Sequence, residues 1–262
     1  MSALSRLLAR TEHRGAALRV ALGYLAAITA AELLTTLLEP RAGLVLHGAL
    51  LVVLLLHSAF VWEFAVRDLL LSLCFAPLIR LLSLSLPLVN FPLVYWYLIT
   101  SVPLFVMVIL IMRTLHFTWY EIGVNLRALP LQIPVSLVGL LFGYMEYHIL
   151  HPKPLAKAFT WEEIWLPALI LMFSTGFAEE IIFRGVMQRA ATEALDHFSI
   201  LYVSAVFAVL HVGYKSLLDV LFVFGVALFF GYVVKKTGNI LGVSLAHGLT
   251  NIVLFLVAPF LW

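Results

Sequence analysis

Two adjacent glutamates and an arginine stand in one of the most apolar parts of the sequence, within the stretch GFAEEIIFRG. Glu180 and Arg184 are four residues apart, so on a helix they share one face and can form an ion pair. Glu179 is turned by about 140° from Arg184 around such a helix and is left without that partner. A lone carboxylate in a cavity is a candidate general base or acid. A purely structural ion network is the less favoured interpretation, because desolvation tends to cancel the Coulomb gain of buried charges.

Two histidines and an asparagine downstream could complete such a site. His211 ends the run VFAVLH, whereas His247 and Asn251 are four residues apart in HGLTN and can donate hydrogen bonds to the same small group. If a turn near 194–198 joins two antiparallel helices, Glu179 and His211 both lie about 24 Å from that turn. The same arithmetic leaves His247 roughly 14 Å lower, and Asn251 is nearer by roughly 6 Å, so helix tilt, a shortened helix or an unwound helix start has to close the gap.

The composition sets the class of protein that must position these side chains. The chain has 262 residues, of which 63% are hydrophobic and 11% are charged, and this predicts a polytopic membrane protein. The single cysteine, Cys74, excludes an intrachain disulfide and a cysteine metal cluster. The formal net charge of +2 argues against a nucleic-acid partner. The expected partners are therefore the lipid bilayer and a membrane-associated protein or peptide, and the Leu- and Ala-rich composition favours a bacterial inner (plasma) membrane.

The apolar runs predict an all-α, polytopic helical bundle of eight or nine transmembrane helices. The third run contains Arg80 and two prolines, so we expect it to be broken or partly interfacial. We expect one integrated membrane domain, with N-terminal helices and an interfacial segment (116–130) in residues 1–130 and a catalytic core in 131–262. If the N-terminus is cytosolic, most Lys and Arg residues of the loops lie on the cytosolic side, and this favours that orientation. The runs are 20–38, 44–66, 69–89, 93–112, 131–150, 163–192, 198–213, 216–234 and 240–260.

Other ionisable side chains in the spans receive simpler interpretations. Glu32, Glu63 and Glu146 are each isolated near a span end, where a snorkelling or locally hydrogen-bonded side chain explains them. Arg80 can reach a lipid headgroup. Three histidines on apolar helices are expected to be core residues with one hydrogen bond, and four others are expected to be exposed. The first group is His47, His57 and His148, and the second is His13, His116, His151 and His197.

Three short motifs occur in order along the apolar core. EEIIFR (179–184) is an EExxxR motif, FAVLH (207–211) is an FxxxH motif that begins at Phe207, and HGLTN (247–251) is an HxxxN motif. Their order and spacing resemble the CPBP family of intramembrane proteases, named for CAAX prenyl proteases and bacteriocin-processing proteins and also called the Abi family. The resemblance covers about 160–258, and the first hundred residues carry no such signal.

The resemblance implies a role for each motif residue. Glu179 would be the general base that activates a water, His211 would help to hold that water, and His247 and Asn251 would form the oxyanion hole. Glu180 and Arg184 would set the helix and the electrostatics of the site. The resemblance also admits a metalloenzyme, because Glu179, His211 and His247 could act as ligands of a divalent metal. The HExxH string is absent, so we expect no cofactor and favour a glutamic-type endopeptidase without metal over the metal-dependent alternative.

Other classes of function remain open from the sequence. A proton-coupled transporter can use Glu and His side chains as a proton relay, although we find no repeat. A haem protein could use His211 and His247 as axial ligands, and the family name also covers non-enzymatic immunity proteins. The substrate is not readable from the sequence: a prenylated CAAX protein, a leader peptide and a C-terminal sorting tail are all candidates.

Overall fold

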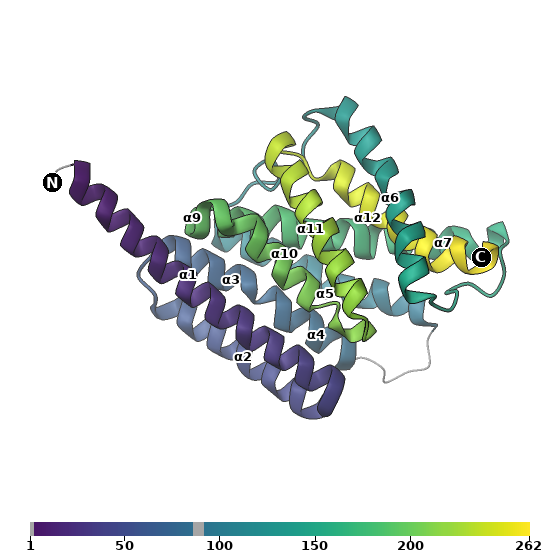
Figure 1. Cartoon of the computed structure of the whole chain (residues 1–262), viewed down its shortest axis with the longest axis horizontal. Coiled ribbons are helices and arrows are strands. Elements are labelled where there is room, and N and C mark those ends of the chain that lie inside the picture. The colour runs from purple at the N-terminus through teal and green to yellow at the C-terminus, as the bar shows by residue number, and fades with distance from the viewer. Residues whose placement is uncertain (1–2, 86–91) are drawn as a thin grey trace.

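A hairpin of two long helices forms one edge of the molecule. The computed structural model of the chain describes residues 3–85 and 92–262, with side chains from residue 14 onward except residue 85. Helix α1 (Ala3–Leu33) continues into a π-helical segment, η1 (Leu34–Leu38), and α2 (Pro40–Phe60) returns beside it (Figure 1). Pro40 starts α2 at a position where its missing N–H removes no helical hydrogen bond.

The third apolar run forms two short helices. Helix α3 (Phe64–Leu73) and helix α4 (Phe75–Ser85) are separated at Cys74, and α5 (Leu93–Thr114) follows. The expected break in this run is therefore present, and Cys74 is fully buried, as expected of a small apolar residue. The rest of the expected span, up to residue 89, lies outside the described residues. The expected exposure of His13 concerns a side chain that is also outside the described part.

The polar-leaning segment 116–130 forms turns that lead into α6 (Leu129–Leu150). Its backbone is bound to the turn between two later helices: Asn239 Nδ2 donates to the carbonyl oxygens of Asn125 at 2.9 Å and Arg127 at 2.7 Å. The segment expected at the interface is thus built from turns up to the start of α6. The docking fixes the start of α6 against the C-terminal helices.

One continuous helical stretch carries the first motif. It consists of α7 (Trp161–Leu171), the π-helical η2 (Met172–Phe177), the short α8 (Ala178–Glu180), the π-helical η3 (Ile181–Met187) and α9 (Gln188–Leu195). The expected turn is the 3₁₀ segment η4 (Asp196–Phe198), after which α10 (Ser199–Val209) runs back. A second 3₁₀ turn, η5 (Val212–Tyr214), follows directly after His211.

The chain ends in two more long helical stretches. Helix α11 (Leu217–Thr237) ends at Gly238, whose φ of +63° is a left-handed C-terminal conformation that suits glycine. Helix α12 (Leu241–Ile252) then continues through the π-helical η6 (Val253–Val257) into α13 (Ala258–Leu261). These two stretches diverge from their shared turn (Figure 1).

Glycines let α12 pack with its backbone close to two neighbours, α6 and η2. A Cβ on Gly139 of α6 would overlap the carbonyl oxygen of Ala246, and one on Gly143 would lie 2.6 Å from Val253 Cβ. On the other side, a Cβ on Gly176 of η2 would lie 2.7 Å from the backbone nitrogen of Gly248. Small residues therefore pack α12 between two neighbours, and the contact at Gly176 brings the helix of the third motif against that of the first.

Seven helical stretches in the described residues are long and apolar enough to cross a membrane. The chain is an all-helical integral membrane protein, and our count of eight or nine is approximate for two physical reasons. Helices α3 and α4, with 10 and 11 residues, are each too short to span alone. The runs 163–192 and 198–213 belong to one helical hairpin, in which α10 has only 11 residues.

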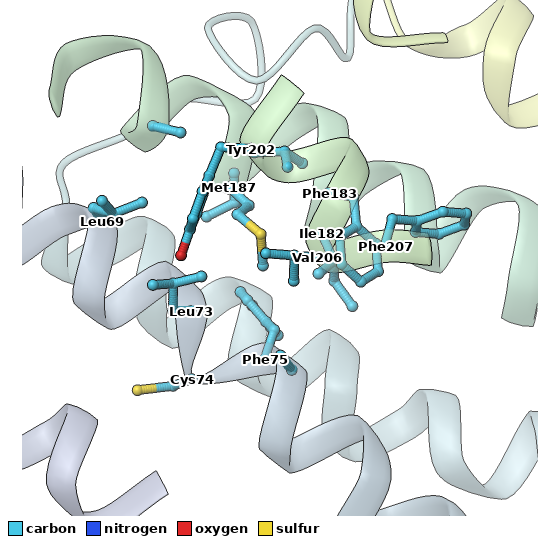
Figure 2. Packing of buried hydrophobic residues seen from close by; sticks show 14 of the residues in the cluster. Leu69, Leu73, Cys74, Phe75, Ile182, Phe183, Met187, Tyr202, Val206 and Phe207 are labelled. Atoms are coloured by element: carbon cyan, nitrogen blue, oxygen red, sulfur yellow. The ribbon is translucent and has the colours of Figure 1, made fainter. Parts of the chain in front are cut away.

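The N-terminal helices pack on the motif helices through one hydrophobic cluster. Figure 2 shows Leu73 and Phe75 from the α3–α4 junction facing Met187 and Val206. Tyr202 of α10 also donates a hydrogen bond to the carbonyl oxygen of Ala21 in α1 at 3.0 Å. This cluster includes residues on both sides of position 130, so the division into 1–130 and 131–262 stays a prediction about organisation.

The close contact of α6 and α12 predicts a large effect of one added methyl group. Gly139→Ala should lower the free energy of unfolding by about 1–3 kcal/mol, because the Ala246 backbone that the methyl group meets cannot rotate away. Gly225→Ala in α11 is the matched control, since its Cβ meets no described atom within 4 Å and alanine favours a helix. Thermal unfolding in detergent micelles measures both. Equal midpoints for the two variants would contradict the packing.

Candidate active site

The predicted ion pair is present in the interior of the molecule. Arg184 Nη1 lies 2.9 Å from Glu180 Oε1, and the two side chains are 1% and 0% exposed. Glu179 is not part of this pair, and its side chain is 28% exposed. Glu179 instead lines a cavity. The helix that carries all three is π-helical on both sides of α8, a local geometry found often at functional sites.

His247 lies beside both glutamates. Its Nδ1 is 2.8 Å from Glu180 Oε1, and its Nε2 is 4.0 Å from Glu179 Oε2. The depth arithmetic that left His247 well below Glu179 is therefore wrong. It assumed antiparallel helices, whereas α12 diverges from α11 and is held against η2 by Gly176 and Gly248 (Figure 1).

His211 stands just beyond the C-terminus of α10, between Leu210 and the η5 turn. Its Nδ1 is 2.9 Å from the carbonyl oxygen of Phe207. A carbonyl oxygen only accepts, so Nδ1 carries the proton in this contact. In the neutral ring, Nε2 is then left as an acceptor. His211 and Glu179 line one cavity, which agrees with their expected equal depth.

Asn251 is held by a residue that the sequence analysis did not single out. Its Nδ2 donates to Thr175 Oγ1 at 2.8 Å, and the Thr175 hydroxyl donates in turn to the carbonyl oxygen of Leu171. An amide nitrogen has two hydrogens, so the second one can serve another acceptor. Thr175 is four residues before Glu179, which is the signal that could have identified it.

All four predicted catalytic side chains line one cavity. Its other polar lining comes from residues of four different elements, including a second carboxylate. These residues are Tyr97, Glu146, Thr175 and Tyr214. A cavity with two carboxylates, two imidazoles, an amide and hydroxyl groups can bind a water and a polar backbone group together.

Glu146 is the main residue that sequence reasoning assigned wrongly. We expected a snorkelling or locally bonded side chain near a span end, but Glu146 is buried and shares the cavity with Glu179. It follows Gly143 by three residues on α6, on the side that packs against α12. This three-residue spacing from Gly143 could have identified Glu146 as a buried residue.

Phe207 connects the motifs through its ring. It contacts the ring of His211 at a centroid distance of 4.7 Å and that of Phe183 at 4.8 Å, and the Arg184 guanidinium lies 4.4 Å from its centroid. Figure 2 shows Phe183 and Phe207 close together at one end of the cluster. This packing restricts the rotamers of the side chains it touches, which supports a positioning role.

Among the residues that the structure describes, no three His, Cys, Asp or Glu side chains are grouped as metal ligands. Of the three residues considered as ligands, His247 contacts Glu180 through Nδ1, and its Nε2 lies 4.0 Å from Glu179 Oε2. We therefore derive no step that passes through a metal.

The fold and this cavity define a polytopic helical membrane protein with Glu, His and Asn side chains gathered in its core. Residues 161–253 match the family model described as type II CAAX prenyl endopeptidase Rce1-like. This match agrees with the resemblance of the three motifs to the CPBP family of intramembrane proteases. Comparisons with curated proteins and with solved structures gave no match.

Proposed function

We propose that the chain is an intramembrane endopeptidase that hydrolyses a peptide bond with a water activated by Glu179. The single observation that supports this most strongly is the shared cavity of Glu179, His211, His247 and Asn251. Amide hydrolysis needs a base for the water and donors for the developing oxyanion, and these four residues supply both. The family match supports a membrane-associated protein as the substrate.

The hydrogen bonds assign a part to each side chain in the proposed mechanism. Glu179 takes a proton from the water, and His211 holds that water through Nε2. The oxygen of the water then bonds to the peptide carbon. His247 and Asn251 donate to the carbonyl oxygen: a His247 ring with two N–H groups would contact Glu180 through Nδ1 and the oxyanion through Nε2. The tetrahedral intermediate collapses when its C–N bond breaks and the leaving nitrogen receives the proton that Glu179 took from the water.

A second, apolar cavity adjoins the first and indicates the kind of substrate. The two cavities share Glu146, His211, His247 and Asn251. The apolar wall beside these four suits an apolar side chain or lipid next to the scissile bond. Its lining residues are Phe207, Phe222, Val223, Val226 and Phe230.

Defined peptide probes test this proposal in proteoliposomes. The probes are a fluorogenic peptide that ends in a farnesylated CAAX sequence, the same peptide without the lipid, and a peptide with one apolar span. We expect cleavage of at least one probe by the purified protein. Cleavage of none of them overturns the proposal, and a proton flux in the same vesicles would then favour the proton-coupled transporter. A bacterial inner-membrane location is part of the proposal, and cell fractionation tests it.

Glu146 is expected to take part in proton transfer in this cavity. Glu146→Gln keeps the size of the side chain but removes a group that exchanges a proton, so we expect kcat to fall about 100-fold. Glu162→Gln, in the exposed first turn of α7, is the matched control and should cleave at the wild-type rate. A wild-type rate for Glu146→Gln would exclude this role for Glu146.

A further inference from the structure

A buried ion pair lies outside the cavity, between helices of the N-terminal half. Arg80 of α4 contacts both oxygens of Glu32 in α1: its Nε donates to Oε1 at 2.8 Å, and its Nη2 is 2.7 Å from Oε2. The Glu32 side chain is 0% exposed. We expected a snorkelling Glu32 and an Arg80 that reaches a headgroup, and both expectations are wrong, because each side chain supplies the partner that the other needs.

A histidine from a third helix completes this cluster. His47 of α2 is fully buried, and its Nε2 is 3.4 Å from Glu32 Oε1. The helices approach closely because Gly43 lies against Thr35, where a Cβ would overlap the threonine side chain. Burying such a set of charges contributes little net stability, since desolvation offsets the attraction. The cluster therefore calls for a role other than stability.

Arg80 also holds the chain segment that carries His211. Its Nη2 donates to the carbonyl oxygen of Leu210 at 2.8 Å, one residue before His211. Helix α10 has ended at Val209, so this carbonyl is among those without a helical partner. A Cβ on Gly213 would lie 3.8 Å from Arg80 Nη1, which places the guanidinium against the turn on both sides of His211.

We propose that the Glu32–Arg80 pair, by binding the Leu210 carbonyl, positions His211 in the cavity. Arg80 is thus a positioning residue, and it stands outside the matched segment 161–253. The hydrogen bond from Nε to Oε1 and the ion contact of Nη2 with Oε2 hold the guanidinium plane, so Nη2 has a defined direction toward the Leu210 carbonyl. As a role in catalysis, this inference rests on the proposed function.

The kinetic test compares substitutions of Arg80 with a control substitution at the start of α2. Arg80→Gln should lower kcat about 100-fold with KM nearly unchanged, as a shift of about 1 Å in a catalytic group can do. Arg80→Lys, which keeps the charge but not the fork, should be intermediate. Arg41→Gln, in the exposed start of α2, should have no effect. The double variant Glu32→Gln/Arg80→Gln should be no slower than Arg80→Gln, because the pair acts as a unit.

A second measurement separates this inference from the proposed function. In histidine-labelled protein, the imidazole NMR signal of His211 is assigned from its loss in His211→Gln. We expect Arg80→Gln and Arg80→Lys to move this signal and to leave that of the exposed His197 in place. If the protein cleaves no probe, the proposed function is refuted, but the NMR signal of His211 still tests the positioning role of Arg80. The positioning role is overturned if folded Arg80 variants keep the His211 signal, or if they keep kcat and lose only thermal stability. If Arg80→Gln does not give folded protein, the same two measurements on Arg80→Lys decide whether Arg80 positions His211.

Discussion

Glu179→Gln is expected to lower kcat about 1,000-fold while KM stays near its wild-type value. Glutamine has the same shape as glutamate and fills the same part of the cavity, but it cannot take a proton from water. The loss would therefore fall on the chemical step and not on substrate binding. The measurement is cleavage of a fluorogenic membrane peptide in proteoliposomes, at equal amounts of folded protein.

Two further variants make this prediction specific. Glu163→Gln changes an exposed glutamate on the same continuous helical stretch and should cleave like the wild type. Glu179→Asp keeps the carboxylate but withdraws it by about one bond, and it should retain part of the activity. If Glu179→Gln cleaves at the wild-type rate, Glu179 is not the base, and Glu146 in the same cavity becomes the candidate.

The pairing within the first motif was predictable because it depends only on local geometry. Glu180 and Arg184 are one helical turn apart, and a helix of any orientation brings them together. The depth of His211 was predictable for a similar reason: a short turn at Asp196–Phe198 joins two helical segments that run back along each other. The helical, membrane-spanning nature of the chain follows from composition, which needs no tertiary contact.

The place of His247 and the partners of Arg80 were not predictable in this way. His247 reaches Glu180 because α12 packs on η2 through Gly176 and Gly248, and nothing in the local sequence gives that crossing. Arg80 and Glu32 are separated by 48 residues, and each looked isolated in its own span. A buried charge needs a partner, so the lesson is to search other spans for an opposite charge before assigning an intramembrane ion to a headgroup.

Arg184→Met is expected to have the largest effect on stability. Arg184 and Glu180 are both buried, and removing the arginine leaves a buried carboxylate without its cation. Breaking a buried ion pair in this way costs about 3–5 kcal/mol. Arg189→Met, one turn further along the helix, removes an arginine whose side chain is 40% exposed and should cost less than about 1 kcal/mol. Thermal or denaturant unfolding in micelles measures both.

The double variant Glu180→Gln/Arg184→Met shows whether stability and catalysis depend on the same contact. Without either charge, no carboxylate is left unpaired at this position, so we expect most of the lost stability to return. A double variant no more stable than Arg184→Met would contradict this. Cleavage should nevertheless stay at least about 100-fold below wild type, because the Glu180 carboxylate that orients His247 through Nδ1 is gone. Recovered stability without recovered activity would mean that Arg184 serves to keep Glu180 charged in the interior. The catalytic benefit would then come from the contact of Glu180 with His247.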